Sequence, residues 1–227
     1  MNSALGFHSL LAQGNWFAGL SADLQQALLE AAQVQLLSAG QVLFRRGDKA
    51  LGVYAVVEGG VRVGAVTAAG KESLLARVEA PQWFGEIALF DGLPRTHDVF
   101  ADSPSTLLLV SESRLHALLT EQPQYWRDFA LLMSHKLRQS FAYLEDLSLL
   151  PAAPRLARRL LAIADQYGEG ASRSLLQLPQ EQLALMLALS RQTTNQILKE
   201  LESLGILRLN YGEIEILDFA RLQHAAD

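Results

Sequence analysis

The order of apolar and polar residues changes character along the chain. Up to residue 37, apolar residues such as Leu20, Leu24 and Leu28 recur at helical spacing, and Ser21 precedes them as a plausible N-cap. From residue 39 to residue 110, short apolar runs alternate with glycine-containing turns. The runs are VLF, VYAVV, VRVGAV, SLLARV, VFA and TLLLV, and the turns include EGG and TAAGKE. The EGG turn (Glu58-Gly59-Gly60) predicts a hairpin, because glycine tolerates the positive φ that hairpin turns require. We therefore predict helix over 1–37 and then a compact antiparallel barrel or roll.

Helical spacing returns over 111–150, where a long uninterrupted helix follows Pro123. Its apolar stripe is spaced 3-4-3-4-3 and consists of Ala130, Met133, Leu137, Ser140, Leu144 and Leu147. A narrow a/d stripe of about two and a half heptads fits a helix packed on its own barrel, but it favours pairing with a second subunit. Pro151 and Pro154 then interrupt the helix. We predict three regions: a domain that contains the roll (1–122), a long dimerisation helix (123–150) and a C-terminal domain (151–227).

The C-terminal region has the pattern of a helix-turn-helix followed by a hairpin. A helix over 155–168 and a short strand over 175–179 come first. Pro179 opens the next helix and Ser190 caps another, which ends at Gly205. The residues expected to be buried on these two helices are Leu183, Met186, Leu187, Thr194, Ile197, Leu198, Leu201 and Leu204. The strands ILRL and EIEIL, joined by NYG, predict a wing.

The polar face of the second helix carries side chains that suit base edges. Arginine can bridge guanine O6 and N7, and glutamine can pair with adenine N6 and N7. The candidate DNA-binding residues are Ser190, Arg191, Gln192, Thr193, Asn195 and Gln196 in the helix, and Arg208 in the wing. A small helical domain with a solvated face is the alternative, because residues 151–227 hold eight Lys and Arg against nine Asp and Glu. Ala188 also stands where many such motifs use glycine. We expect DNA binding with modest non-specific affinity.

Composition narrows the choice of function. The 227 residues carry a net charge of −5 and include no cysteine, which excludes disulfides, thiolate zinc sites and a cysteine nucleophile. No apolar run approaches the roughly 20 residues that a bilayer span needs. The sequence lacks Gly-x-Ser-x-Gly, a Walker-type loop and a His-x-x-x-His pair. We expect a soluble cytoplasmic protein without membrane contact, catalytic residues or a metal site.

The order of roll, long helix and winged helix-turn-helix resembles the catabolite activator (CRP/FNR) superfamily of bacterial transcription regulators. The resemblance covers about Leu20 to Leu217 and rests on the motifs FGEIALFDGLPRT and LALSRQTTNQILKELESLGIL. It implies an α+β fold with an N-terminal antiparallel β-roll, or jelly roll, of the cyclic-nucleotide-binding kind. It also implies a homodimer that binds palindromic double-stranded DNA, holds a small effector in the roll and contacts RNA polymerase.

The first motif resembles the phosphate-binding cassette of that family. Gly85 would let the backbone approach an anion, and Ile87 and Ala88 would begin a helical turn with free N–H groups. Arg95 would contact a cyclic phosphate and Glu86 a ribose hydroxyl. The implied ligand-binding residues are Gly85, Glu86, Ile87, Ala88, Arg95, Thr96 and His97 in the roll, with Ser140 and Phe141 in the long helix.

Some positions depart from the family pattern. His97 stands where the residue is usually small, and Phe141 stands where cAMP-responsive members have a hydroxyl residue, although its ring could stack on a base. In the readout helix, Gln192 and Gln196 replace an acidic residue and an arginine. Three alternatives remain open for the roll: it binds cAMP, it binds another nucleotide-like or phosphate-bearing ligand, or it binds no ligand. Two further alternatives are that His97 ligates a haem and that the protein is a sensor acting through protein contacts instead of DNA.

Overall fold

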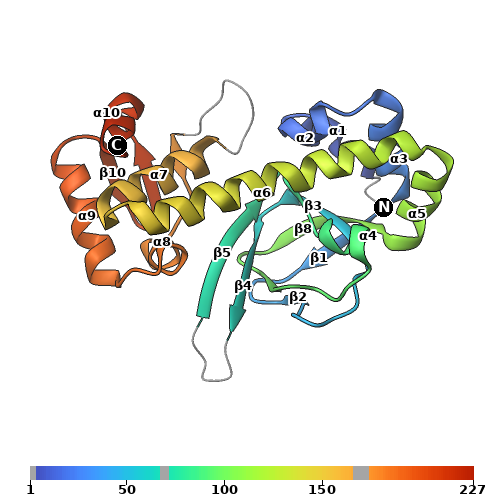
Figure 1. The fold of residues 1–227 in the computed structure, drawn as a ribbon, viewed down its shortest axis with the longest axis horizontal. Coiled ribbons are helices and arrows are strands. Elements are labelled where there is room, and N and C mark those ends of the chain that lie inside the picture. Colours follow the sequence, from blue (N-terminus) through green and yellow to red (C-terminus); the bar gives the residue numbers. More distant parts are fainter. Residues whose placement is uncertain (1–3, 67–71, 166–173) are drawn as a thin grey trace. The chain divides into compact units, whose positions relative to one another are not determined.

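The computed structural model describes residues 4–66, 72–165 and 174–227 (Figure 1). The chain divides into two compact units, Met1–Arg138 and Gln139–Asp227, and this division falls inside one long helix. Part of the predicted turn at 67–72, the end of the predicted helix at 166–168 and Arg173 lie outside the described residues. No helix in the described ranges is long and apolar enough to cross a membrane.

The first unit begins with short helices, and one prediction there is wrong. The elements are η1 (Ala4–Phe7), α1 (His8–Leu11), α2 (Asn15–Ala18) and α3 (Ala22–Ala31). The Ser21 hydroxyl accepts a hydrogen bond from Leu24 N (3.3 Å), which confirms the predicted N-cap of α3. The predicted helix does not continue to residue 37, because Ala32–Leu37 forms strand β1, paired with β8 (Ser105–Ser111). Pairing with a strand more than 60 residues away outweighs a weak local helical pattern.

Two four-stranded antiparallel sheets confirm the predicted roll. One sheet has the order β1-β8-β3-β6 and the other the order β2-β7-β4-β5. The remaining strands are β2 (Val42–Phe44), β3 (Gly52–Glu58), β4 (Gly60–Val66), β5 (Glu72–Glu79), β6 (Trp83–Phe84) and β7 (Asp98–Ala101). Strand β3 is buried on both faces: Tyr54 and Val56 enter the core between the sheets, whereas Val53 and Ala55 enter the core beneath the helices. This alternation places Tyr54 inside the roll.

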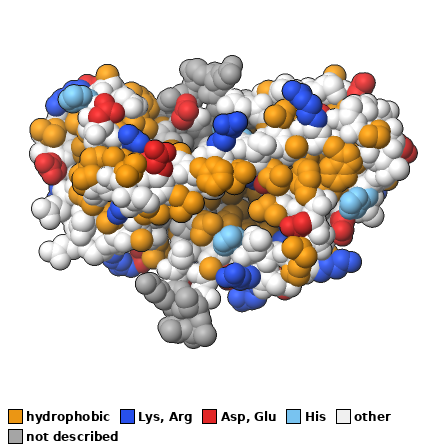
Figure 2. Space-filling view, viewed as in Figure 1, with side chains coloured by type: hydrophobic (Ala, Val, Ile, Leu, Met, Phe, Trp, Pro, Cys, Tyr) orange, Lys and Arg blue, Asp and Glu red, His pale blue; other side chains and the backbone are white. Residues whose placement is uncertain are grey.

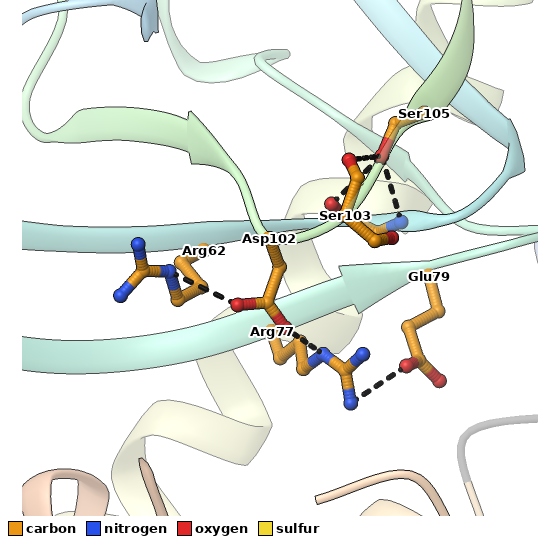
Figure 3. Close-up of polar contacts among 7 residues, drawn as sticks. Arg62, Arg77, Glu79, Asp102, Ser103 and Ser105 are labelled. Atoms are coloured by element: carbon orange, nitrogen blue, oxygen red, sulfur yellow. Dashed lines mark hydrogen bonds and ion pairs between the residues drawn. The ribbon is translucent and has the colours of Figure 1, made fainter. Parts of the chain in front are cut away.

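The turn from β3 to β4 is tied to the loop before β8. Gly59 has a φ of +71°, and a Cβ there would lie 2.5 Å from the Pro104 carbonyl oxygen, which explains the glycine. The Ser105 hydroxyl accepts a hydrogen bond from Gly60 N (3.0 Å) and donates one to the Ser103 carbonyl (2.8 Å) (Figure 3). The glycine turn therefore forms, but the predicted hairpin is wrong. Strand β3 pairs with β8 and β6, whereas β4 pairs with β7 and β5, so the turn carries the chain from one sheet to the other.

A charge cluster lies beside this turn (Figure 3). The Asp102 carboxylate is 3.2 Å from Arg62 Nε and 2.9 Å from Arg77 Nε, and Arg77 is also 3.0 Å from Glu79. Two cations and two anions are thus balanced. The cluster fastens the loop after β7 to strands β4 and β5, and we assign it a structural role.

Helices complete the first unit and lead to the second. They are α4 (Ile87–Asp91), α5 (Glu112–Glu121), η2 (Pro123–Tyr125) and α6 (Trp126–Leu149). Phe129 and Leu132 of α6 are buried. The later stripe residues Leu137 and Leu144 are 51% and 56% exposed, and the neighbouring Phe141 is 60% exposed. Figure 2 shows hydrophobic side chains along the course of α6. The later part of this stripe is therefore left uncovered within one chain.

The second unit contains the predicted winged helix-turn-helix. After the end of α6 come α7 (Ala152–Ala164), β9 (Leu175–Leu176), α8 (Gln180–Leu187), α9 (Arg191–Ser203), β10 (Leu207–Asn210), β11 (Glu213–Ile216) and α10 (Phe219–His224). The three strands form a sheet in the order β10-β11-β9. One expected core residue is wrong: Leu204 is 50% exposed, because α9 ends at Ser203 and Leu204 is its C-cap.

Candidate functional site

Arg95 is the centre of the candidate ligand site in the roll. Its side chain is only 6% exposed, and its guanidinium donates to the Gly85 carbonyl (2.9 Å) and the Gly52 carbonyl (2.7 Å). Its backbone is also held, since Arg95 N donates to Asp48 O (2.9 Å) and Gly47 N donates to Arg95 O (2.8 Å). The β2–β3 loop and the start of β3 therefore fix this arginine from both sides.

Aromatic rings line the other side of the Arg95 guanidinium. Its Cζ lies 4.3 Å from the Phe44 ring centroid and 5.6 Å from that of Tyr54. Burial lowers the pKa of Arg95, and the contact with Tyr54 opposes this; burial raises the pKa of the Tyr54 hydroxyl, and Arg95 opposes that. An arginine stays charged at neutral pH in such surroundings. A fixed positive charge therefore stands inside the roll.

Glu86 lies at the start of α4 and is paired with a residue that the sequence analysis did not single out. The side chain of Glu86 is buried, and its Oε2 accepts from Lys136 Nζ (2.7 Å), which also donates to the Trp83 carbonyl (2.9 Å). Lys136 belongs to α6 and precedes Ser140 by four residues, so one helical turn separates them on the same face. That spacing was the available signal for Lys136. The carboxylate expected to meet a sugar is thus already held by an ammonium group.

The backbone around Gly85 explains the glycine. Gly85 has a φ of +90°, and a Cβ there would lie 2.9 Å from Arg95 Nη1. Any other residue would be strained and would press on the guanidinium. Of the two residues that follow Glu86, Ala88 is buried and Ile87 is exposed. Gly85, Glu86, Ala88 and Arg95 are therefore brought together at one end of β3.

Thr96 and His97 continue the chain beyond Arg95. Thr96 is exposed and His97 half-buried, and His97 Nδ1 lies 3.0 Å from the Thr96 hydroxyl. Burial, helped by Arg46, lowers the pKa of His97, while Asp98 opposes the shift. The imidazole is therefore neutral at neutral pH and adds no charge for an anion. No group of three or more His, Asp or Glu in the described ranges could hold a metal ion.

Ser140 and Phe141 belong to the second compact unit, directly after the division in α6. Both side chains are exposed. The roll residues form the candidate ligand site by themselves, and a role for Ser140 and Phe141 in it stays a prediction.

The helix-turn-helix has the local geometry that the sequence predicts. The Ser190 hydroxyl accepts from Thr193 N (3.0 Å) and caps α9. Thr194 and Leu198 are fully buried, whereas Arg191 and Gln192 are exposed. Gln196 is exposed as well. The helix therefore presents its polar N-terminal face to solvent and packs the opposite face on the domain.

The link between α8 and α9 depends on a strained residue. Ala188 has a φ of +53° and is the only non-glycine residue with positive φ in the described ranges. The left-handed conformation costs roughly 1–2 kcal/mol for a residue with a Cβ. The tight turn that sets the angle between the two helices is therefore formed by alanine against its backbone preference.

Several candidate DNA-binding side chains already have partners within the second unit. Arg191 pairs with Glu181 of α8. Asn195 is half-buried, and its Nδ2 donates to Gln180 Oε1 (2.9 Å). In the wing, Arg208 lies 2.8 Å from Glu215. Acidic partners weaken the positive potential of this face. The face is therefore ordered but not strongly basic.

Comparisons with known families agree with this two-part organisation. The family model of the cyclic nucleotide-binding domain matches residues 34–122, and that of the Crp-like helix-turn-helix domain matches residues 154–225. A cyclic AMP receptor protein from Thermus thermophilus is 30% identical over 210 residues, which cover 92% of this chain and 95% of that protein. A CRP-like cAMP-activated global transcriptional regulator from Mycobacterium tuberculosis is 27% identical over 220 residues, covering 96% of this chain and 98% of that protein.

Solved structures give the same result for the fold. A transcriptional regulator of the CRP/FNR family from Thermus thermophilus superposes with a TM-score of 0.66 at 27% identity, covering 86% of this chain and 98% of that one. FixK2 from Bradyrhizobium japonicum superposes with a TM-score of 0.77 at 21% identity, with the same coverage of 86% and 98%, and supports the fold alone.

Proposed function

Because the chain belongs to the CRP/FNR family of bacterial transcription regulators, we propose that it is an effector-responsive regulator that binds palindromic promoter DNA as a homodimer. The proposed effector is cAMP or another nucleotide-like molecule held in the roll. The readout elements are the two copies of α9, placed in successive major grooves about 34 Å apart.

The observation that carries the DNA-binding proposal is the arrangement of α9. A capped N-terminus, a buried face and an exposed face with Arg191, Gln192 and Gln196 occur on one helix, next to a wing. Guanidinium and amide groups on the N-terminal half of such a helix are the groups that read bases in the major groove. Thr193 and Ser190 would then contact phosphates, and Arg208 would do so from the wing.

The effector proposal is supported by Arg95 and Glu86. A buried carboxylate at the N-terminus of α4 and a buried cation in the loop after this helix suit a sugar hydroxyl and a phosphate. To meet a phosphate, Arg95 would exchange at least one of its carbonyl partners for the anion. Relatives named as cAMP-activated regulators make cAMP the first compound to test.

Homodimer formation is supported by the exposed stripe on α6. Leu137 and Leu144, spaced by seven residues with Ser140 between them, are half-exposed in a single chain. Leucines at this spacing stabilise paired helices when they pack against a second copy. The proposed role in transcription also implies contact with RNA polymerase.

A ligand-independent roll is the second candidate, and two observations favour it. The Arg95 guanidinium already donates to two carbonyls at 2.7 and 2.9 Å, and His97 and Phe141 occupy positions where cAMP-responsive members differ. In that case Arg95 would be a structural residue, and DNA binding would not depend on an effector.

One set of measurements tests these proposals on the full-length protein. Palindromic sites are selected from a random double-stranded pool without effector and with cAMP, cGMP or a cyclic dinucleotide, and thermal shifts are recorded with the same compounds. We expect one enriched palindrome and one compound that raises both the melting temperature and the enrichment. Enrichment without any thermal shift would support the ligand-independent roll. No enriched site under any condition would reject DNA binding, and a monomeric mass by light scattering would reject the dimer.

A further inference from the structure

The last two turns of α6 are joined to the DNA-binding elements by side chains. The Tyr143 hydroxyl donates to the carbonyl of Met186 in α8, and the Asp146 carboxylate lies 2.8 Å from Arg158 Nη1 of α7. Tyr143 and Asp146 are three residues apart and share one face of α6. This face differs from the exposed stripe of Leu137 and Leu144, so these contacts do not compete with pairing of the helix.

Arginines of α7 complete the connection. Arg159 is half-buried, its Cζ lies 5.4 Å from the Tyr143 ring centroid, and its Nη2 is 3.7 Å from Met186 Sδ. Arg155 donates to the Leu187 carbonyl (3.4 Å). The carbonyls of Met186 and Leu187 belong to the last turn of α8, where the helix dipole favours a positive charge. Both arginines therefore stabilise the end of α8 immediately before the strained turn at Ala188.

These contacts extend across the proline break. Arg158 reaches in two directions, since its Nη1 meets Asp146 of α6 and its Nε donates to the Ala226 carbonyl (3.0 Å) near the C-terminus. Helix α7 also buries Leu156 and Leu160 in the same unit. The break at 150–151 is therefore covered by side-chain contacts on both sides. In agreement, the division between the two compact units lies at Arg138–Gln139 inside α6, not at the prolines.

We propose that Tyr143, Asp146, Arg158 and Arg159 form a clamp that fixes the direction of α9 relative to the last two turns of α6. The four are positioning residues: they touch no DNA, and they make the end of α6 move as one body with the helix-turn-helix. A movement of α6 would then be transmitted to α9 and would not be absorbed by bending at the proline break. The role of the clamp in DNA binding rests on the proposed function, because the angle it holds matters only when two readout helices meet one operator.

The absence of cysteine makes the clamp directly measurable. Cysteines introduced at Ala142 in α6 and Lys199 in α9, both exposed, carry spin labels, and labelled protein is mixed with excess unlabelled protein. Pulsed electron–electron double resonance on the full chain then measures the distance between the two spin labels, and so between the two helices. We expect a single narrow distance that is unchanged by cAMP. The variant Tyr143→Phe with Asp146→Asn removes two contacts with little change in volume and should broaden the distribution.

A matched control separates the clamp from a general effect of charge. Glu145→Gln removes a carboxylate at the neighbouring exposed position, and it should leave the distance distribution narrow. If the double variant keeps the wild-type distribution, or if the control broadens it equally, the clamp is rejected. This measurement needs no DNA, so it stands even if the protein fails to select any operator.

Operator spacing tests whether the clamp positions the readout helices. Affinity is measured for the selected palindrome and for versions whose spacer is changed by one or two base pairs. Loss of a neutral hydrogen bond shifts an equilibrium by about two- to tenfold. The double variant should therefore lose at least about twofold of its preference for the original spacer, while its affinity for a single half-site stays at the wild-type value. An equal loss for every spacer and for the half-site would indicate general damage and overturn the positioning role.

Discussion

The two compact units each place an arginine at their candidate site, but in opposite surroundings. Arg95 in the roll is 6% exposed and is held by backbone carbonyls and aromatic rings. Arg191 in α9 has a side chain that is 73% exposed and pairs with a carboxylate on the neighbouring helix. A buried charge with fixed partners has a defined position at all times, whereas an exposed ion pair contributes little and exchanges readily with water.

The fold therefore fixes the position of Arg95, whereas Arg191 can exchange its carboxylate partner for a contact on DNA. Removing Arg95 leaves buried carbonyls without donors, so its effects on binding and on stability are coupled. Removing Arg191 leaves Glu181 in water, so the effect is confined to what Arg191 contacts on DNA. Four substitutions test this contrast, and their expected effects decrease from Arg95→Ala to Ala188→Gly.

Arg95→Ala should have the largest effect. Loss of a paired charge-assisted contact lowers affinity for a phosphate-bearing effector by about 100-fold or more. Isothermal titration with the effector found by thermal shift measures this loss, and Arg114→Ala, an exposed arginine of α5, is the control. Unchanged effector affinity and unchanged operator response would show that Arg95 is structural only.

Lys136→Met tests the buried carboxylate of the roll. It leaves Glu86 buried without its ammonium partner, which costs about 2–3 kcal/mol of unfolding free energy; this is below the usual range for a fully buried pair because the Lys136 side chain is 36% exposed. Urea denaturation measures the change. Lys49→Met, at an exposed position, should have almost no effect, and adding Glu86→Gln to Lys136→Met should recover part of the loss. If Lys136→Met loses no more unfolding free energy than Lys49→Met, the buried carboxylate does not depend on its partner, and the contrast between the two sites is contradicted.

Arg191→Ala should affect DNA recognition and leave the fold intact. We expect a loss of about 1–3 kcal/mol in operator binding and relaxed preference at one base pair, with an unchanged urea midpoint. Competition binding with single-base variants of the operator measures it. Lys199→Ala, on the C-terminal half of the same helix, should keep the base preference. Equal weakening on every DNA sequence would assign Arg191 to phosphate contact instead.

Ala188→Gly should give the smallest effect and the opposite sign. Glycine adopts the left-handed conformation without strain, so the variant should gain about 0.5–1 kcal/mol in unfolding free energy. Ala142→Gly, in the exposed middle of α6, should lose a similar amount because glycine disfavours helix. Urea midpoints for the two variants are expected to move in opposite directions. A destabilised Ala188→Gly would mean that the alanine methyl makes a contact that outweighs the strain.

Local signals predicted the elements whose pattern is strong. The caps at Ser21 and Ser190, the turn at Gly59 and the helix-turn-helix all follow from residues a few positions apart. The hairpin expected at Gly59 did not, because β3 and β4 join different sheets. Strand β1 and Lys136 did not follow in this way, since β1 depends on β8 and Lys136 meets Glu86 across 50 residues. Leu204 was misjudged because the helical pattern continues one residue past the point where α9 ends.

The family, the order of roll, long helix and winged helix-turn-helix, and the residue types at both candidate sites follow from the sequence alone, because turns, caps and periodicity are local properties of the chain. The partners of those residues depend on how the elements pack. The packing places Arg95 against two carbonyls, Glu86 against Lys136, and Tyr143 against the end of α8. Such partners come from segments far apart in the sequence, and their contacts exist only once the sheets and helices have packed.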